Sequence, residues 1–413
     1  MVNSSNEFEL GVDVSLLARL EAAGARFSDC PGVGAASVDP LRLLRDAGFT
    51  TARLRLFHTP TGRGAQVNDL AYTLELAKRC VAAGFEILLC PHFSDTWADP
   101  GRQRVPAAWA GLDLGGLCAA VRTYTADVLR AFDDAGCRPA TVQVGNEITG
   151  GFLWDAGRVA RTAAATNDDW SGVLERDESK WVAFASLLCA AIAGIEDGCG
   201  SSTEIMLHID RGGDEGAAAC FFEWMNRYGV RYDRIGLSYY PFWHGSLESL
   251  CGTVTALYRV FGRPVHVVET AFPAERHPVY GVDGGVEAEA KRFGTPPTHA
   301  VDYPLTEAGQ HAFVSDLLDA MREHGDRGWR GVSYWAPEWI PVHGHADEPD
   351  AETCWPRALF DRGGGARPAL EAFRRFAARE AGGSGVVARG LGRGVREPLR
   401  AGVGTGGVGG ARG

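Results

Sequence analysis

Eight short apolar runs, each followed by a segment of helical periodicity, constrain the fold of this 413-residue chain more than any other feature. The runs are rich in Val, Ile and Leu, which is typical of parallel strands buried on both faces. Eight strand-then-helix units over about 370 residues predict an α/β fold, a closed (β/α)₈ barrel, rather than an open sheet. The predicted strands span residues 9–14, 51–57, 86–93, 141–147, 204–210, 234–240, 264–270 and 331–336. The predicted helices span residues 39–47, 69–83, 114–135, 178–196, 217–227, 246–261, 306–324 and 368–378.

The long connections follow predicted strands and do not precede them. They are residues 94–113, 148–177, 271–304 and 337–367. This asymmetry predicts an elaborated groove at the C-terminal face of the barrel, where barrel enzymes carry their sites. Residues 381–413 are Gly-rich, with scattered Arg and few large apolar side chains. We therefore expect one barrel domain, residues 1–380, followed by a disordered tail, residues 381–413.

Two of the predicted strands end in a glutamate. The run 141–147 closes on Gly-Asn-Glu147, and the run 264–270 carries Glu269 at its end, 122 residues later in the chain. A single glutamate at a strand end is more often a solvated loop residue. Two carboxyl groups at the C-terminal ends of strands 4 and 7 of one barrel are instead what glycosidic bond hydrolysis requires. Asn146 supplies an amide next to the acid, suited to a sugar hydroxyl.

Composition limits the classes of partner that this chain is expected to bind. The formal net charge is −11, without basic clusters outside the tail, which disfavours nucleic acid and anionic membrane as partners. No run reaches the length of a membrane helix, and the N-terminus lacks the pattern of a secretory signal. This predicts a cytoplasmic protein with ten reduced cysteines, or a secreted one if the start codon is misassigned.

Longer strings resemble a known family. They are His92-Phe93-Ser94-Asp95-Thr96-Trp97-Ala98-Asp99-Pro100, Gly236-Leu237-Ser238-Tyr239-Tyr240-Pro241-Phe242-Trp243-His244-Gly245 and Val268-Glu269-Thr270-Ala271-Phe272-Pro273. With Gly145-Asn146-Glu147 they resemble glycoside hydrolase family 53, the arabinogalactan endo-β-1,4-galactanases, from about Phe8 to about Phe376. The resemblance implies a retaining barrel enzyme in which Glu147 is the general acid/base and Glu269 the nucleophile.

Charge considerations agree with this division of roles. The acid must keep its proton near neutral pH, so burial or the second carboxylate should raise its pKa, whereas arginine or tyrosine hydroxyls should keep the nucleophile ionised. Arg53 and Arg55 lie on one side of predicted strand 51–57, and an arginine inside a barrel is costly unless it meets a carboxylate. The family pattern favours Arg55.

Further positions are candidates for binding sugar. Large aromatic side chains at strand ends stack on sugar faces, and His, Asp and Tyr side chains there bind hydroxyls, although core packing explains such residues equally well. The candidates are Asn146, Arg55, His92, Asp95, Trp97, His208, Asp210, Tyr239, Trp243 and Trp335. Two positions depart from the family pattern: Cys90 stands where Asp is usual, and Ala336 stands where Glu often follows the Trp of strand 8.

The expected substrate is galactan or galacto-oligosaccharide. Another retaining β-glycosidase activity (exo-galactosidase, mannanase or xylanase) remains an alternative, as does a catalytically silent carbohydrate-binding barrel. We expect a monomer that requires no cofactor and no catalytic metal. A structural calcium ion occurs in some relatives after strand 7, but the acidic residues there, Asp283, Glu287 and Glu289, match no ligand pattern and resemble a solvated loop.

Overall fold

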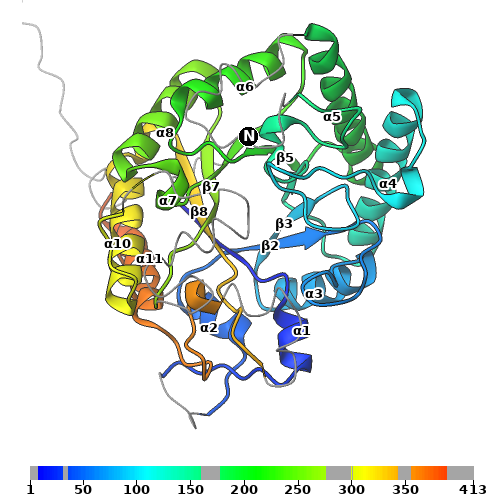
Figure 1. Ribbon diagram of the computed structural model, residues 1–413. Coiled ribbons are helices and arrows are strands. Elements are labelled where there is room, and N and C mark those ends of the chain that lie inside the picture. Colours follow the sequence, from blue (N-terminus) through cyan, green and yellow to red (C-terminus); the bar gives the residue numbers. More distant parts are fainter. Residues whose placement is uncertain are drawn as a thin grey trace, which may run out of the picture.

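The computed structural model describes residues 8–30, 36–159, 177–275, 299, 301–342 and 355–387. Its centre is a closed barrel of eight parallel strands in chain order, with β8 paired to β1, and helices surround it (Figure 1). The predicted (β/α)₈ fold is confirmed. The strands are β1 (Glu9–Asp13), β2 (Thr51–Leu56), β3 (Glu86–Pro91), β4 (Thr141–Gln143), β5 (Glu204–Ile209), β6 (Arg234–Ser238), β7 (Val265–Thr270) and β8 (Trp329–Trp335).

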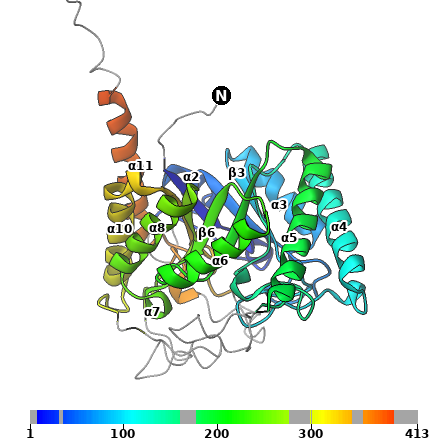
Figure 2. The same cartoon turned by 90° about the horizontal axis from the view of Figure 1, so that it is seen from above.

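The helices form an outer layer around the strands, seen from a second direction in Figure 2. They are α1 (Leu17–Ala22), α2 (Pro40–Asp46), α3 (Leu70–Ala82), α4 (Leu114–Asp134), α5 (Glu178–Cys199), α6 (Glu215–Arg227), α7 (Pro241–His244), α8 (Leu247–Phe261), α10 (Glu307–Glu323) and α11 (Pro368–Val387). Short 3₁₀ turns are η1 (Ala107–Trp109), η2 (Ile148–Gly150), η5 (Gly325–Arg327) and η6 (Trp355–Arg357). The predicted helices are all present, while the short α1 and α7 were not predicted.

Aspartate side chains fix where several helices begin. Asp69 accepts a hydrogen bond from the backbone N–H of Tyr72, and Asp113 accepts one from Gly116. Asp214 does the same at the start of α6. Each carboxylate satisfies a backbone donor that has no partner inside the helix, and its negative charge faces the positive end of the helix dipole. These caps explain why the starts of the helices could be read closely from the sequence.

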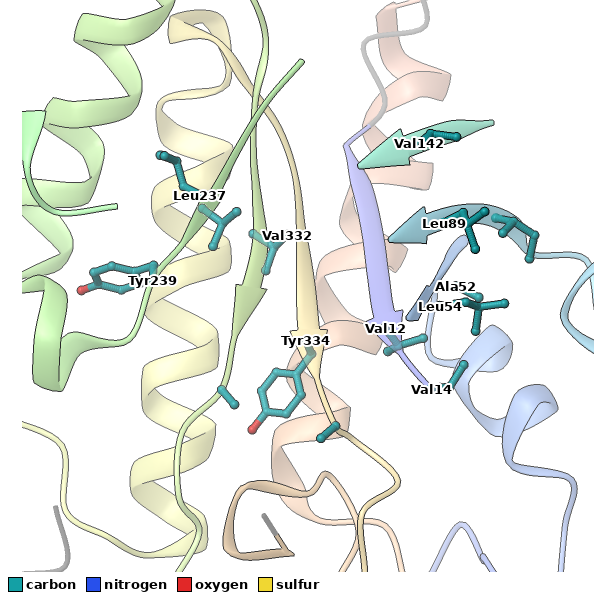
Figure 3. Close-up of a cluster of buried hydrophobic side chains, with 14 of the residues drawn as sticks. Val12, Val14, Ala52, Leu54, Leu89, Val142, Leu237, Tyr239, Val332 and Tyr334 are labelled. Atoms are coloured by element: carbon teal, nitrogen blue, oxygen red, sulfur yellow. The ribbon is translucent and has the colours of Figure 1, made fainter. Parts of the chain in front are cut away.

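The apolar core lies between the strands and the helices. Figure 3 shows part of this layer, which includes Val12, Leu89 and Val332. A separate small cluster of Leu88, Met206 and Val268 fills the middle of the barrel interior. Because side chains alternate along a strand, each strand supplies both layers.

Polar groups occupy the barrel interior on either side of that cluster. Near the N-terminal ends of the strands, Glu9 accepts hydrogen bonds from Arg234 at 2.6 Å and from Thr51 at 2.9 Å. Near the C-terminal ends lie Asp13 and Arg53, both almost fully buried. The first group closes the base of the barrel with a buried ion pair, and the second belongs to the candidate site.

The C-terminal helix is longer than predicted. The predicted end was residue 378, whereas α11 continues to Val387, so the boundary expected at residue 381 falls within a helix. Residues 388–413, the remainder of the expected tail, lie outside the described residues. The glycines after Ala381 suggested a stop, but helix propensity is a weak signal that neighbouring turns override.

Among the described helices, α5 is the one that is long and apolar enough to cross a membrane by length and composition. Its apolar side chains have partners in the barrel's outer layer: Trp181 stacks on Trp224 of α6 with ring centroids 5.0 Å apart, and Phe184 packs on Phe221. The helix therefore packs as a core helix of this fold.

Candidate active site

Glu147 follows β4 directly and is held in a left-handed backbone conformation. The strand pairing ends at Gln143, earlier than the predicted residue 147, and Glu147 has φ 48° and ψ 53°. Few residues other than glycine adopt this conformation, which concentrates at functional sites. The buried amide of Gln103 supports the turn, because its Nε2 donates to the carbonyl oxygen of Asn146 at 2.8 Å. The turn places the Glu147 side chain at the C-terminal end of the barrel.

A local irregularity in β7 brings Glu269 to the same end. Leu237 of β6 pairs with Val267, but Ser238 pairs with Glu269, so one extra residue is inserted in β7. Such a bulge breaks the alternation of side chains and re-aims the next one. As a result Val268 packs inside the barrel with Leu88, and Glu269 also faces inward, where it meets Arg53.

Two donors hold the Glu269 carboxylate. Tyr240 Oη–H donates to Oε1 at 2.9 Å, and Arg53 Nη1 lies 3.3 Å from Oε2. Burial raises the pKa of Glu269, while the Arg53 charge and the Tyr240 hydrogen bond oppose that rise. These two contacts stabilise the ionised form, which is the form that attacks an anomeric carbon.

Glu147 has the opposite environment. Burial raises its pKa well above the ordinary value, and the charges of Glu269 and Asp210 raise it further. The hydroxyl of Ser238, which donates to Oε1 at 2.7 Å, is the one opposing contact among these groups. A carboxyl group in such surroundings holds its proton to higher pH than an exposed one and suits a general acid, and the two glutamates therefore differ as their expected roles require.

Arg53 connects the two sides of the site. Its guanidinium donates to Asp13 Oδ2 at 2.7 Å, to Asn146 Oδ1 at 2.7 Å and to Gln143 Oε1 at 3.1 Å. Asn146 Nδ2 in turn donates to the carbonyl oxygen of Ala98 at 2.9 Å. The amide that was expected to bind a sugar hydroxyl is thus fixed in one orientation by protein contacts at both of its ends.

The preference for Arg55 was wrong as far as contact with the Glu269 carboxylate is concerned. Arg53 contacts Glu269, whereas Arg55 lies 4.2 Å from the ring centroid of Trp97 and 3.5 Å from Asp13 Oδ1. Both arginines face the barrel interior, so alternation along β2 could not distinguish them. Their difference in height along the strand decides which one reaches Glu269.

Two other expected sugar contacts are also corrected. Tyr239 is buried, stacks on Phe313 of α10 and donates its hydroxyl to the carbonyl oxygen of Gly245 at 3.0 Å. His208 has no exposed surface, and protein groups occupy both of its ring nitrogens. Neither side chain has a free polar atom to offer a sugar. Tyr240, the neighbour of Tyr239, is the tyrosine that reaches the site.

Two of the candidate acids are occupied by protein donors. The carboxylate oxygens of Asp95 accept backbone N–H groups of Thr59 and Ala107 and so tie two loops together. Asp210 accepts the hydroxyl of Thr149 and lies 3.2 Å from Arg211. Asp95 therefore organises the loops beside the site, while Asp210 adds negative charge near Glu147.

The aromatic candidates gather on the side of β3 and β8. Trp97 and Trp335 are partly exposed, and the buried Trp339 lies between them. Trp339 is nearly parallel to Trp97, at 12°, and is tilted by 55° to Trp335. The two exposed rings are therefore inclined to one another. Trp243, on α7, packs edge-on against Tyr240 and is also partly exposed.

His92 lies beneath this aromatic group. Its Nδ1 accepts the backbone N–H of Ala98 at 3.0 Å, which leaves the ring proton on Nε2. Burial and the charges of Arg55 and Arg53 hold the pKa of His92 well below its ordinary value, so the ring is neutral. Nε2–H finds no acceptor within the described part of the chain and remains a candidate donor to a ligand.

A buried carboxyl group stands near the departure at Ala336. Ala336 has φ 52°, and two residues later Glu338 accepts the backbone N–H of Leu16 at 3.1 Å. Burial, followed by the charge of Asp13, raises the pKa of Glu338 to about 8. Its Oε2 is without a hydrogen-bond partner among the described residues. This carboxyl group is therefore protonated at neutral pH.

Glu338→Gln should stabilise the protein at alkaline pH. The unfolded carboxyl group titrates near 4.5 and the folded one near 8, so stability falls as pH rises through that window. Glutamine has the same shape and never ionises. We expect a gain on the order of 3–5 kcal/mol above pH 8, from about 1.4 kcal/mol per pKa unit, and almost none at pH 4. Urea unfolding at both pH values measures this; an equal difference at both would contradict the assignment.

Several site residues were missed in the sequence. Asp13, Gln103, Gln143, Ser238 and Tyr240 hold or surround the two glutamates. Gln143 and Ser238 resemble ordinary strand residues and gave no signal. Asp13 and Tyr240 stand at strand ends, the position that drew attention to Glu147, so the same criterion could have found them.

The described residues of the site provide no donor set suited to a metal ion. Among the described residues there is no cluster of three or more His, Cys, Asp or Glu side chains placed to bind one. Asp283, Glu287 and Glu289, the acidic residues considered for calcium, lie outside the described residues. Nine cysteines in the described part, Cys90 among them, are free thiols.

Comparison with known proteins identifies the family. Residues 9–373 match the family model described as "Glycosyl hydrolase family 53". An uncharacterized protein of Niallia circulans, from the bgaB 5′ region, is 38% identical over 81% of this chain and 84% of its own length. An endo-beta-1,4-galactanase of Bacillus subtilis is 31% identical over 82% of this chain and 72% of its own length.

A solved structure agrees with these sequence matches. The Ignisphaera aggregans GH53 catalytic domain superposes with a TM-score of 0.75 at 30% identity, over 90% of this chain and 97% of that one. The family model covers all eight strands, including both glutamates. The chain therefore belongs to glycosyl hydrolase family 53 and is a glycoside hydrolase.

Proposed function

We propose that this enzyme is an endo-β-1,4-galactanase that cleaves galactan by double displacement, with Glu269 as the nucleophile and Glu147 as the acid/base. The observation that carries the proposal is the unequal treatment of the two carboxyl groups. Arg53 and Tyr240 stabilise the ionised form of Glu269, while burial and two nearby carboxylates raise the pKa of Glu147 and favour its protonated form. Relatives with galactanase names that match most of this chain support the substrate.

In the first step, the Glu269 carboxylate attacks the anomeric carbon and forms a glycosyl ester. The bond to the glycosidic oxygen breaks, and Glu147 gives its proton to that oxygen, which releases the leaving sugar as an alcohol. Negative charge then passes from Glu269 to Glu147. Because Glu147 no longer faces an anionic Glu269, its pKa falls, which favours the ionised form that the second step needs as a base.

In the second step, Glu147 takes a proton from water, and the oxygen attacks the same carbon from the face that the leaving sugar vacated. The ester to Glu269 breaks, the sugar is released with its original configuration, and both glutamates return to their starting protonation states. Arg53 supports both steps, since it lies beside Glu269 and fixes the Asn146 amide.

Substrate choice in this proposal depends on the aromatic side chains near β3 and β8. β-1,4-linked galactose has an axial 4-oxygen, so its chain bends where cellulose runs straight. Trp97 and Trp335 approach from β3 and β8 and are inclined to one another, because Trp339 between them is parallel to one and tilted to the other. Aromatic rings that are inclined to one another suit a bent polysaccharide chain better than a straight one.

We expect the purified enzyme to hydrolyse β-1,4-galactan and to show little activity on mannan, xylan and cellulose, with Glu269→Gln as the inactive control. Trp97→Ala should weaken the binding of long galactan by about 1–3 kcal/mol, the range for removing a large buried side chain. Initial rates on the four polymers and binding isotherms of Trp97→Ala measure these effects. A preference for mannan would overturn the proposed substrate.

A further inference from the structure

A closed ring of hydrogen bonds surrounds Glu147. Its backbone N–H donates to His208 Nδ1 at 3.3 Å, His208 Nε2 lies 2.9 Å from Ser238 Oγ, and Ser238 Oγ lies 2.7 Å from Glu147 Oε1. His208 and Ser238 have no exposed surface, so neither exchanges these contacts for water. The main chain and the side chain of one residue are thus joined through two buried groups.

Neighbouring donors fix the direction of each bond in this ring. Arg53 Nε can only donate, and it points at Gln143 Oε1 at 3.1 Å, which orients the Gln143 amide. Gln143 Nε2 therefore donates to His208 Nδ1, at 3.0 Å. Two N–H groups, from Gln143 and from the Glu147 backbone, converge on Nδ1, which must be the unprotonated nitrogen.

The remaining directions follow from that assignment. Burial and the charge of Arg53 keep the pKa of His208 well below its ordinary value, so the ring carries one proton, on Nε2. Nε2–H donates to Ser238 Oγ, and the Ser238 hydroxyl then gives its own hydrogen to Glu147 Oε1. If Oε1 carried a proton aimed at Ser238, the serine hydroxyl would face two donors and lose its acceptor.

We propose that His208 and Ser238 are positioning residues that hold Oε1 of Glu147 as a permanent acceptor, so that Oε2 is the oxygen that carries and transfers the catalytic proton. This inference rests on the proposed acid/base role of Glu147. The ring leaves Oε2 free of the contacts that bind Oε1, and it locks the carboxyl group against rotation. Each turnover then begins with the proton on the same atom.

The ring also sets the acidity of Glu147. The charged groups that act on Glu147 are Glu269, Asp210 and Asp99, which raise its pKa, and the Ser238 hydrogen bond lowers it. A hydroxyl that donates to a carboxylate favours the ionised form. Loss of that hydroxyl should therefore raise the pKa of Glu147 and move the alkaline limb of the pH–rate profile to higher pH.

Ser238→Ala tests the proposal on whichever β-1,4-linked oligosaccharide the unchanged enzyme hydrolyses fastest. We expect kcat to fall about 10- to 100-fold, the range for losing a hydrogen bond to a charged group. KM should change less than about twofold, since the buried hydroxyl touches no substrate. The alkaline limb of kcat/KM should shift to higher pH, and Ser238→Thr, which keeps the hydroxyl, should restore it.

The barrel offers a matched control. His266 Nε2 and Ser333 Oγ form a second buried His–Ser pair at 2.9 Å, and both side chains are fully buried. Within the described part of the chain, the pair contacts neither Glu147 nor Glu269, and His266 faces Glu9 at the other end of the barrel. Ser333→Ala should therefore lower the melting temperature without moving the alkaline limb. Equal pH profiles for Ser238→Ala and Ser333→Ala would overturn the proposal.

A combined variant separates this proposal from the proposed role of Glu147. In a Glu147→Ala background, Ser238→Ala should have no further effect on an activated aryl glycoside, because the serine acts through Glu147. A further loss of about 10-fold would overturn the positioning role. If Glu147→Ala alone shows no dependence on the leaving group, the acid/base assignment itself is wrong, whatever the behaviour of Ser238.

Discussion

Glu269→Ala should lower the turnover of galactan by on the order of 10⁴- to 10⁶-fold, the effect of removing a catalytic nucleophile. The loss has two causes. No carboxylate remains to form the glycosyl ester, and Arg53 and Tyr240 lose the group that accepts their hydrogen bonds. Steady-state rates on galactan measure the effect, and circular dichroism confirms that the variant folds.

Tyr240→Phe is the matched comparison for this variant. It removes the donor at 2.9 Å from Glu269 Oε1 and leaves the nucleophile in place. Its loss of turnover should therefore be much smaller, about 10- to 100-fold. A Glu269→Ala enzyme that retained more activity than Tyr240→Phe would show that another group attacks the sugar.

Glu147→Ala should separate substrates by their leaving groups. Galactan, whose leaving sugar needs a proton, should lose about 10²- to 10⁴-fold in kcat/KM, the usual contribution of general acid catalysis. A dinitrophenyl β-galactobioside, whose leaving group needs little protonation, should lose less than about tenfold in its first step. Burst kinetics with the aryl substrate measure that step directly. Equal losses on both substrates would mean that Glu147 is not the acid.

The fold could be predicted because it depends on local patterns, and the candidate pair, Glu147 and Glu269, was proposed from the same patterns. Buried parallel strands give continuous apolar runs, and a carboxyl group at the end of such a run is visible in one sequence. Strand 4 was predicted to reach residue 147, and the left-handed turn at Glu147 still leaves its side chain at the barrel end. An error of a few residues at a strand end therefore did not change the candidate site.

The partners of the pair depend on three-dimensional details that leave little trace in sequence. Arg53 and Arg55 share a face of β2, and only the height of Glu269 relative to β2 decides which arginine it contacts.

 The Glu269 carboxylate lies at the height of Arg53, which is nearer than Arg55 to the N-terminal end of β2. Tyr240 reaches the site in place of the predicted Tyr239 because β6 ends at Ser238, and beyond a strand end the alternation of faces no longer holds.

The bulge in β7 illustrates the same limit. Regular alternation would place Val268 inside the barrel and Glu269 outside it, among the helices. The extra residue between the pairs Leu237–Val267 and Ser238–Glu269 lets both side chains face inward. Bulges depend on the register of two strands that are distant in sequence, so a single chain read by itself does not reveal them.

The configuration of the product formed with azide tests the central claim most directly. Azide replaces the missing nucleophile in Glu269→Ala and attacks the anomeric carbon of the aryl galactobioside, which should yield a glycosyl azide of inverted configuration. In Glu147→Ala, azide replaces the activated water after the ester to Glu269 has formed, which should yield a glycosyl azide of retained configuration. Proton NMR of the anomeric hydrogen distinguishes the two products. Opposite configurations from the two variants are the predicted result, and the same configuration from both would contradict the assignment of Glu269 as nucleophile and Glu147 as acid/base.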